Sequence, residues 1–187
     1  MSISVVYYSK GGTTHQVADA IGEGIAQQSV PSQLLRVTDA QIIEGRLRSD
    51  HYLSAIDQCS AVIFGSPTYM GGPAAQFKTF CDASSDRWER QSWSGKLAAG
   101  FTVGSSPGGD QLATLQYFSI LAAQHGMLWV NLQMLADIES TSNAQLGFAG
   151  TVSGDTISES DKSNAAALGS RVAAICKRYT SPDYRNI

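Results

Sequence analysis

Glycines and small hydroxyl side chains gather in three short segments of this 187-residue chain, each directly after an apolar run. The first segment contains Ser9, Lys10, Gly11, Gly12, Thr13 and Thr14. The second contains Pro67, Thr68, Tyr69, Met70 and Gly71, and the third contains Gly104, Ser105, Ser106, Gly108 and Gly109. Backbone N–H groups in such a loop, at the start of a helix, can bind a phosphate without much positive charge.

The first segment differs from the commoner phosphate-binding motifs. Lys10 precedes the glycines and no Gly-Lys-Ser/Thr follows them, which excludes a Walker A loop. No GxGxxG follows the first apolar run, which excludes a dinucleotide-binding motif. The first segment also contains no cysteine that could act as a phosphatase nucleophile. The second segment adds Tyr69, an aromatic that can stack on a planar ligand. A mononucleotide with a large heterocycle, such as FMN, fits these features better than ATP, because no magnesium-binding carboxylate pattern accompanies them.

Strands and helices that could position these segments alternate along the chain. Apolar runs predict strands at residues 3–8, 33–37, 61–65, 97–103 and 127–132, with residues 135–138 as an extension of the last. Apolar spacings of three and four predict helices after the first, second and third segments and a last helix capped by Ser158. We expect Pro73 to begin the second of these helices and Asp110 to be the N-cap of the third. We also expect a short helix near residues 52–57 and a long loop at 139–157.

This alternation predicts an α/β fold, in which a doubly wound, five-stranded parallel sheet of order 2-1-3-4-5 lies between two layers of helices. We expect residues 1–187 to form one domain. Ligands of such sheets bind beyond the carboxyl ends of the strands, where the strand order reverses. That position lies between the first and third strands, so the first and second segments should flank one ligand, with the third nearby.

Composition narrows the function further. The net charge of −3 excludes a general nucleic-acid footprint, and 43% hydrophobic with 16% charged residues is the composition of a folded domain. The three cysteines form no CxxC, no histidines have ligand spacing, and no metal site is expected. Neither a signal peptide nor a membrane span is recognisable, so we expect a cytoplasmic protein.

Longer matches resemble a known family. Residues 8–14 (YSKGGTT), 65–78 (GSPTYMGGPAAQFK), 125–127 (HGM) and 153–155 (SGD) are similar to the flavodoxin-like NAD(P)H:quinone oxidoreductases of the WrbA type. The second block is the most specific, and the likeness covers nearly the whole chain. It implies a flavodoxin-like fold, bound FMN, and two-electron hydride transfer from NAD(P)H to a quinone by a ping-pong route. It also implies a homo-oligomer, a tetramer or a dimer, in which neighbouring subunits complete each site.

The resemblance also implies roles for individual residues. The first segment would hold the FMN phosphate, the second would contact the isoalloxazine, and the third would wrap its other edge. Trp88 would wall the substrate pocket, and His125 matches the family histidine beside the quinone. The family often has arginine where this chain has Tyr69, which bears on contacts with nicotinamide phosphate or substrate.

Three alternatives stay open from the sequence. A flavodoxin that passes single electrons between proteins has the same fold, although the carriers we would compare are strongly acidic. An NAD(P)H-dependent flavin reductase or an azoreductase-like relative also shares it. The third alternative is a phosphate binder that takes no flavin. For Trp88 and His125, the structural interpretations are an interface anchor and a helix-end residue, respectively.

Overall fold

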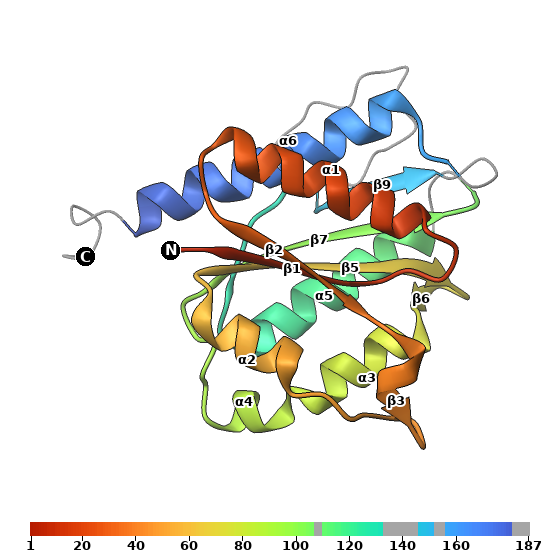
Figure 1. The fold of residues 1–187 in the computed structure, drawn as a ribbon, viewed down its shortest axis with the longest axis vertical. Coiled ribbons are helices and arrows are strands. Elements are labelled where there is room, and N and C mark those ends of the chain that lie inside the picture. Colours follow the sequence, from red (N-terminus) through yellow and green to blue (C-terminus); the bar gives the residue numbers. More distant parts are fainter. Residues whose placement is uncertain (107–109, 133–145, 152–155, 181–187) are drawn as a thin grey trace.

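A parallel β-sheet forms the centre of the computed structural model, which describes residues 1–106, 110–132, 146–151 and 156–180 (Figure 1). Its strands are, in spatial order, β2 (Ser32–Val37), β1 (Ile3–Tyr8), β5 (Ala61–Tyr69), β7 (Leu97–Gly104) and β8 (Leu128–Trp129). Every pairing between these neighbours is parallel. The predicted doubly wound order 2-1-3-4-5 is therefore confirmed.

The fifth position of the sheet is shared by two short strands. β8 pairs with the start of β7, and β9 (Phe148–Thr151) pairs with its end. The predicted strand at 127–132 is thus too long, and the predicted loop at 139–157 contains a strand. The predicted extension at 135–138 lies outside the described residues. The sequence did not predict β9, because its four residues, FAGT, include two small residues and form no apolar run.

Helices cover both faces of the sheet (Figure 1). On one face lie α1 (Thr13–Gln27) and α6 (Glu159–Tyr179), and on the other α2 (His51–Gln58), α3 (Ala75–Ala83) and α5 (Asp110–Gln124). Two buried apolar clusters fill the two interfaces, which produces the three-layer α/β/α architecture. Ser158 caps α6 as expected, accepting from the Asp161 N–H at 3.0 Å, and Gly126, at φ 68°, follows the end of α5.

Several local elements differ from the prediction. β5 continues to Tyr69 and turns back through β6 (Gly72–Pro73), so Pro73 pairs with Thr68 instead of starting a helix. Asp110 is the first residue of α5 itself. The segment after β2 forms a short 3₁₀ helix, η1 (Asp39–Gln41), and a hairpin of β3 (Ile42–Ile43) and β4 (Arg46–Leu47). A short helix, α4 (Ser85–Glu89), follows α3.

None of the helices in the described ranges is long and apolar enough to cross a bilayer. The same ranges contain no group of three or more His, Cys, Asp or Glu side chains arranged to hold a metal ion.

Candidate functional site

Three neighbouring strands end at the same edge of the sheet and carry the three glycine-containing segments there. The register pairs Tyr7 with Gly65 and Pro67 with Val103. Adjacent strands lie about 4.8 Å apart, so the ends of β1 and β7 are separated by about 10 Å. The first segment therefore lies beside the second, and the second beside the third, as the sequence predicted.

The first segment forms a turn that opens α1. Gly12 precedes the helix with φ 99°, and Ser9, which is buried, accepts the Gly12 N–H at 3.1 Å and the His15 N–H at 3.3 Å through its Oγ. The N–H groups of the remaining first-turn residues, Thr13 and Thr14, have no acceptor within the helix. A Cβ built on Gly11 or Gly12 meets nothing within 4 Å. Free donors and open space at a helix start suit an anion such as phosphate.

Side chains behind this turn hold it in place. Arg36, at the end of β2, donates from Nη2 to the Ser9 carbonyl at 2.5 Å, which sets a guanidinium next to the turn. The Tyr7 hydroxyl lies 2.6 Å from His15 Nδ1, and His15 Nε2 lies 3.5 Å from Asp19. Burial raises the pKa of Tyr7 to about 12, so the phenol stays protonated at physiological pH. The first turn of α1 is thereby tied to the buried strand β1.

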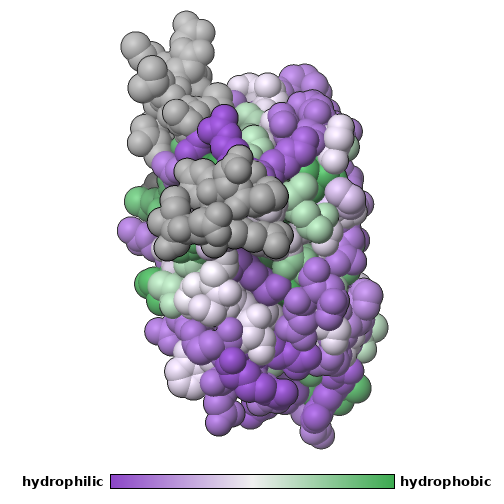
Figure 2. Space-filling view, turned by 90° about the vertical axis from the view of Figure 1, so that its left-hand side faces the viewer, coloured by the Kyte–Doolittle hydropathy of each residue, from purple (hydrophilic) through white to green (hydrophobic). Residues whose placement is uncertain are grey.

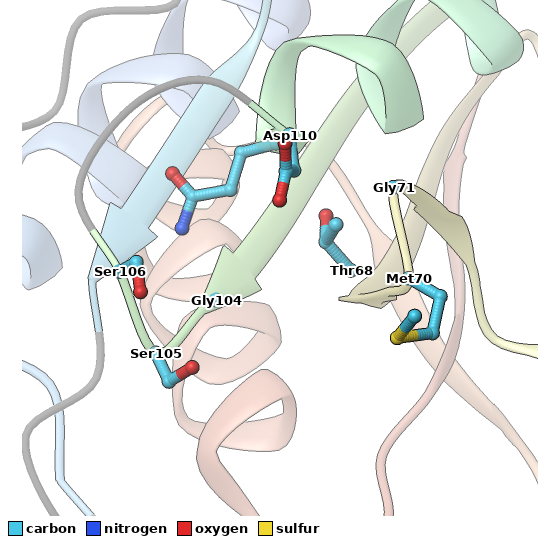
Figure 3. A pocket seen from close by; sticks show the side chains of 8 residues that line it. Thr68, Met70, Gly71, Gly104, Ser105, Ser106 and Asp110 are labelled. Atoms are coloured by element: carbon cyan, nitrogen blue, oxygen red, sulfur yellow. The ribbon is translucent and has the colours of Figure 1, made fainter.

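The second and third segments enclose a pocket of about 380 Å³ (Figure 3). Six predicted site residues line it: Thr68, Met70, Gly71, Gly104, Ser105 and Ser106. Pro67 is buried in β5, and Tyr69, the last residue of β5, is 47% exposed and is not among the residues that line the pocket. The predicted residues Gly108 and Gly109 lie outside the described residues.

A chain of hydroxyl groups fixes the wall of this pocket. Thr68 Oγ1 lies 2.8 Å from Thr102 Oγ1 and 2.7 Å from Thr114 Oγ1. Thr102 donates in turn to the carbonyl of Ser66 at 2.7 Å. Because Thr102 and Thr114 are fully buried, their hydroxyls need these partners, and Thr68 is held in one orientation.

The lip of the pocket is a two-residue β-turn between β5 and β6. Met70 and Gly71 both have positive φ, 47° and 77°, as the turn type that matches strand twist requires. Methionine is unusual in this conformation, and the Met70 side chain is fully exposed beside the pocket (Figure 3). An exposed apolar side chain on a constrained turn is well placed to contact a flat ring.

Two further residues line the pocket that were not predicted from the sequence. Asp110 and Gln111 line it from the start of α5, and Gln111 donates to the carbonyl of Gly150 at 2.9 Å, joining α5 to β9. Among the described residues that line the pocket, Asp110 is the one that carries a charge. Their position directly after the third segment was the available signal. Arg36 was missed as well, because only the strand pairing shows that it lies beside the first segment.

The structure does not bring Trp88 and His125 to the pocket of their own chain. α3 and α5 both start at the pocket edge and run to the opposite edge, where the Gly95 N–H donates to the Gly126 carbonyl at 2.9 Å. Trp88 projects from α4 at that edge, 48% exposed. Figure 2 views the molecule from this side, and its lower part is covered mainly by hydrophilic residues.

His125 is buried at this second edge. Its Nε2 lies 2.9 Å from Ser84 Oγ, its ring lies 4.4 Å from that of Trp93, and its Nδ1 has no partner within the described part of the chain. Burial lowers its pKa to about 4, so it is neutral at physiological pH. Within one chain the ring is thus enclosed between α3, α5 and Trp93 and does not line the pocket at which the quinone contact was predicted.

Nearby, α4 is anchored by charge. Arg87 lies 2.7 Å from Asp50 and 3.3 Å from Asp57, and the Trp93 Nε1–H donates to Asp57 at 2.7 Å. Trp88 is the next residue after Arg87, so these ion pairs hold in place the helix from which Trp88 projects into solvent.

Comparisons with known proteins agree with this architecture. The family model of NADPH-dependent FMN reductase matches residues 1–140. Flavodoxin FldP of Pseudomonas aeruginosa is 34% identical over 95% of this chain and 91% of its own length. An NAD(P)H dehydrogenase (quinone) of Geotalea daltonii is 32% identical over 94% of this chain and 96% of its own length.

Solved structures show the same likeness. A flavodoxin, WrbA-like protein from Agrobacterium tumefaciens matches with a TM-score of 0.79 and 37% identity, over 96% of this chain and 99% of that protein. A flavodoxin from the domain Archaea, at 20% identity and a TM-score of 0.65, shares the fold.

Proposed function

The chain belongs to the family of NADPH-dependent FMN reductases, and we propose from this premise that it is an FMN-dependent enzyme that transfers hydride from NAD(P)H to a quinone or a similar acceptor. The observation that carries the proposal is the continuity of the phosphate-binding turn with the pocket across three adjacent strand ends. One ligand with a phosphate at one end and a flat ring at the other would occupy both.

The residues present fit FMN. Ser9 to Thr14 would hold its phosphate through the free N–H groups of the first turn of α1, with Lys10 and Arg36 as the nearby cations. The second segment, with Thr68 and Met70, would bind one side of the ring, and Gly104 to Ser106 the other. When bound, the flavin supplies the hydride chemistry, and the protein supplies binding and orientation.

Pocket residues in this proposal orient the ring and do not move protons. The Thr68 hydroxyl is fixed by Thr102 and Thr114, so that wall does not rearrange. Gly71, where a Cβ would meet nothing within 4 Å, lets backbone approach the ring closely, and Gly104 leaves room for the side chain of Gln111, which also lines the pocket. The fully exposed Met70 would shield one face of the ring from water.

Trp88 requires a second copy in this proposal. Because α4 lies at the opposite edge of the sheet, Trp88 can wall a flavin pocket only when it comes from a neighbouring subunit. This geometry supports a homo-oligomer, a dimer or a tetramer, in which the site is shared between chains. His125 then has a structural role, supporting the edge from which the partner's Trp88 projects.

The proposed location is the cytoplasm. Cys59, Cys81 and Cys176 are free and buried, and none is paired as a disulfide. Burial raises the pKa of each of these thiols, which keeps them protonated and unreactive. Three reduced thiols accord with a reducing compartment.

Flavodoxin is the second candidate, because two of the similar proteins that are more than 30% identical to this chain carry that name. A one-electron carrier would bind FMN in the same turn and pocket but would not accept hydride from a nicotinamide.

FMN titration followed by initial-rate kinetics tests the proposal. We expect the protein to quench flavin fluorescence at micromolar concentration, and the loaded protein to oxidise NADH or NADPH with a quinone, giving the parallel double-reciprocal lines of a ping-pong route. Tight FMN binding without nicotinamide oxidation would favour the carrier. Unquenched FMN at micromolar protein would eliminate both candidates.

A further inference from the structure

The pocket between the second and third segments has a carboxylate on one wall. Asp110, the first residue of α5, is exposed, and Figure 3 shows its side chain pointing from the start of that helix toward the space between Thr68 and Ser106. The other described lining residues contribute hydroxyl groups, an amide, a thioether and glycine backbone. Among the side chains that the structure describes there, a ligand thus meets one charge, and that charge is negative.

The charge of Asp110 is not cancelled by a neighbouring cation. None of the ion pairs between described residues includes it. Lys10 and Arg36 belong to the first segment and to β2, on the far side of β5, and the ends of β1 and β7 lie about 10 Å apart. That distance is about one Debye length at physiological salt, so solvent ions screen these cations from the carboxylate.

The site is therefore polarised along the row of strand ends. The end at β1 offers free N–H groups together with Lys10 and Arg36, whereas the end at β7 carries Asp110. We propose that Asp110 is a specificity-determining residue, whose carboxylate makes the pocket select uncharged acceptors and disfavour acceptors with a carboxylate or sulfonate on the ring. This role of Asp110 rests on the proposed function, because it names the class of acceptor that the same pocket takes.

Both substrates of the proposed reaction bring uncharged rings to the pocket. A quinone carries no charge, and neither does the reduced nicotinamide ring, because the negative charges of the dinucleotide reside on its phosphates. An acceptor with an anionic group on its ring would instead place that group beside Asp110, where no described lining residue is a cation. Two like charges about 4 Å apart lower affinity by a factor of about five in water, and by more where the pocket excludes water.

Two quinones with the same ring system test this selectivity: 2-methyl-1,4-naphthoquinone, which is uncharged, and 1,4-naphthoquinone-2-sulfonate, which is an anion. Both are assayed with the FMN-loaded protein and the same nicotinamide. The ratio of kcat/KM for the uncharged quinone to kcat/KM for the sulfonate should be about fivefold lower in Asp110→Asn than in the wild type. Because the comparison is between ratios, it is independent of the redox potentials of the two quinones and of any general loss of activity in the variant.

Glu23→Gln is the matched control. It removes the same unit of charge from an exposed position on α1, about 15 Å along the helix from the first segment, and should leave the ratio as in the wild type. A second measurement needs no turnover: the FMN-loaded protein is titrated with 2-naphthalenesulfonamide and with 2-naphthalenesulfonate, which differ in charge but little in size. Followed by the visible absorbance of the flavin, Asp110→Asn should bind the sulfonate about fivefold more tightly relative to the sulfonamide than the wild type does.

The outcomes separate specificity from a structural role. The start of a helix favours an acidic residue, so Asp110→Asn with lower thermal stability but unchanged ratios would mean that the carboxylate only supports α5. That result would overturn the role of Asp110 in specificity and leave the proposed function standing. Equal shifts in Asp110→Asn and Glu23→Gln would also overturn it, because they would reflect the net charge of the protein. Charge-dependent ligand binding in a protein that oxidises no nicotinamide would support the role of Asp110 and contradict the proposed function.

Discussion

At the scale of single residues, His125 shows how burial changes the part that a side chain can play. The resemblance to the family implied a substrate contact for this histidine, but the ring is enclosed beside Trp93 and its Nδ1 has no partner within the described residues. An uncharged ring tolerates this environment, and a protonated one does not. Protonation of His125 is therefore linked to unfolding.

The first prediction is that protonation of His125 lowers the stability of the protein in acid. The folded pKa of about 4 lies below the ordinary value of 6.5, so between these values the unfolded chain binds the extra proton. The contribution of His125 to the free energy of unfolding should be constant above pH 6.5, fall as the pH drops toward 4, and change by about 3 kcal/mol in total.

Urea denaturation at a series of pH values measures this effect. Carboxylates also titrate near pH 4, so the comparison is with His125→Gln, whose amide can still reach Ser84 Oγ. The variant should be less stable at pH 7 but should show a flatter profile between pH 6.5 and 5. Identical slopes in both proteins would show that His125 is not the titrating group.

The three glycine-containing segments could be predicted from the sequence, because glycine and hydroxyl residues that directly follow apolar runs are typical of ligand-binding loops. Six of these residues do line one pocket. The sequence could not show Arg36 beside Ser9, since that contact depends on the register between β1 and β2. It also could not separate Trp88 from the pocket, because the direction of α3 sets that distance.

At the scale of elements, α1 and α6 lie side by side on one face of the sheet and touch through glycines (Figure 1). A Cβ on Gly24 would lie 1.9 Å from the Ala166 carbonyl oxygen, and one on Gly169 would lie 2.1 Å from that of Ile21. The two backbones therefore approach more closely than any side chain allows.

The second prediction compares two glycines of α1. Gly24→Ala should destabilise the protein by about 1–3 kcal/mol, because the helices must move apart. Gly22→Ala should stabilise it by about 0.5–1 kcal/mol, because its Cβ would make an ordinary 3.6 Å contact with Leu34 and alanine favours the helix. Thermal unfolding of both variants measures the two effects. A stabilising Gly24→Ala would mean that the helices are not in contact here.

Element order was predictable, since alternating apolar runs and helical spacings specify a parallel sheet. The strands that were not predicted, β6 and β9, share a physical cause: each forms because it pairs with a neighbouring strand. β6 forms because the two-residue turn at Met70 and Gly71 folds Pro73 back onto Thr68. β9 forms because β7 has a free edge beyond the end of β8. Such short strands have too few residues to show a pattern of their own.

At the scale of the whole molecule, the two parts of the proposed site lie at opposite edges of the sheet of each chain. The pocket lies at one edge and Trp88 at the other. The resemblance assigns Trp88 to the site, whereas the fold places it at the edge of the sheet opposite the pocket, and for this reason we propose that it comes from another chain. The shared site predicts that two defective chains can complement each other.

The third prediction is that complementation. Gly12→Val should abolish FMN binding, because Gly12 has φ 99° and faces the open cradle. Trp88→Ala should bind FMN but turn over slowly. Mixed in equal amounts and allowed to exchange, the two variants should recover about a quarter of wild-type turnover, since half of the dimers are mixed and each has one intact site. Turnover equal to the sum of the separate variants would argue against shared sites.

The most direct test of the central proposal is rapid anaerobic mixing of the FMN-loaded protein with NADH and, separately, with NADPH. We predict that at least one nicotinamide bleaches the visible absorbance of the flavin in a single two-electron step, and that a quinone added afterwards restores it. Bound flavin that neither nicotinamide bleaches would contradict an NAD(P)H oxidoreductase, whatever else the pocket binds.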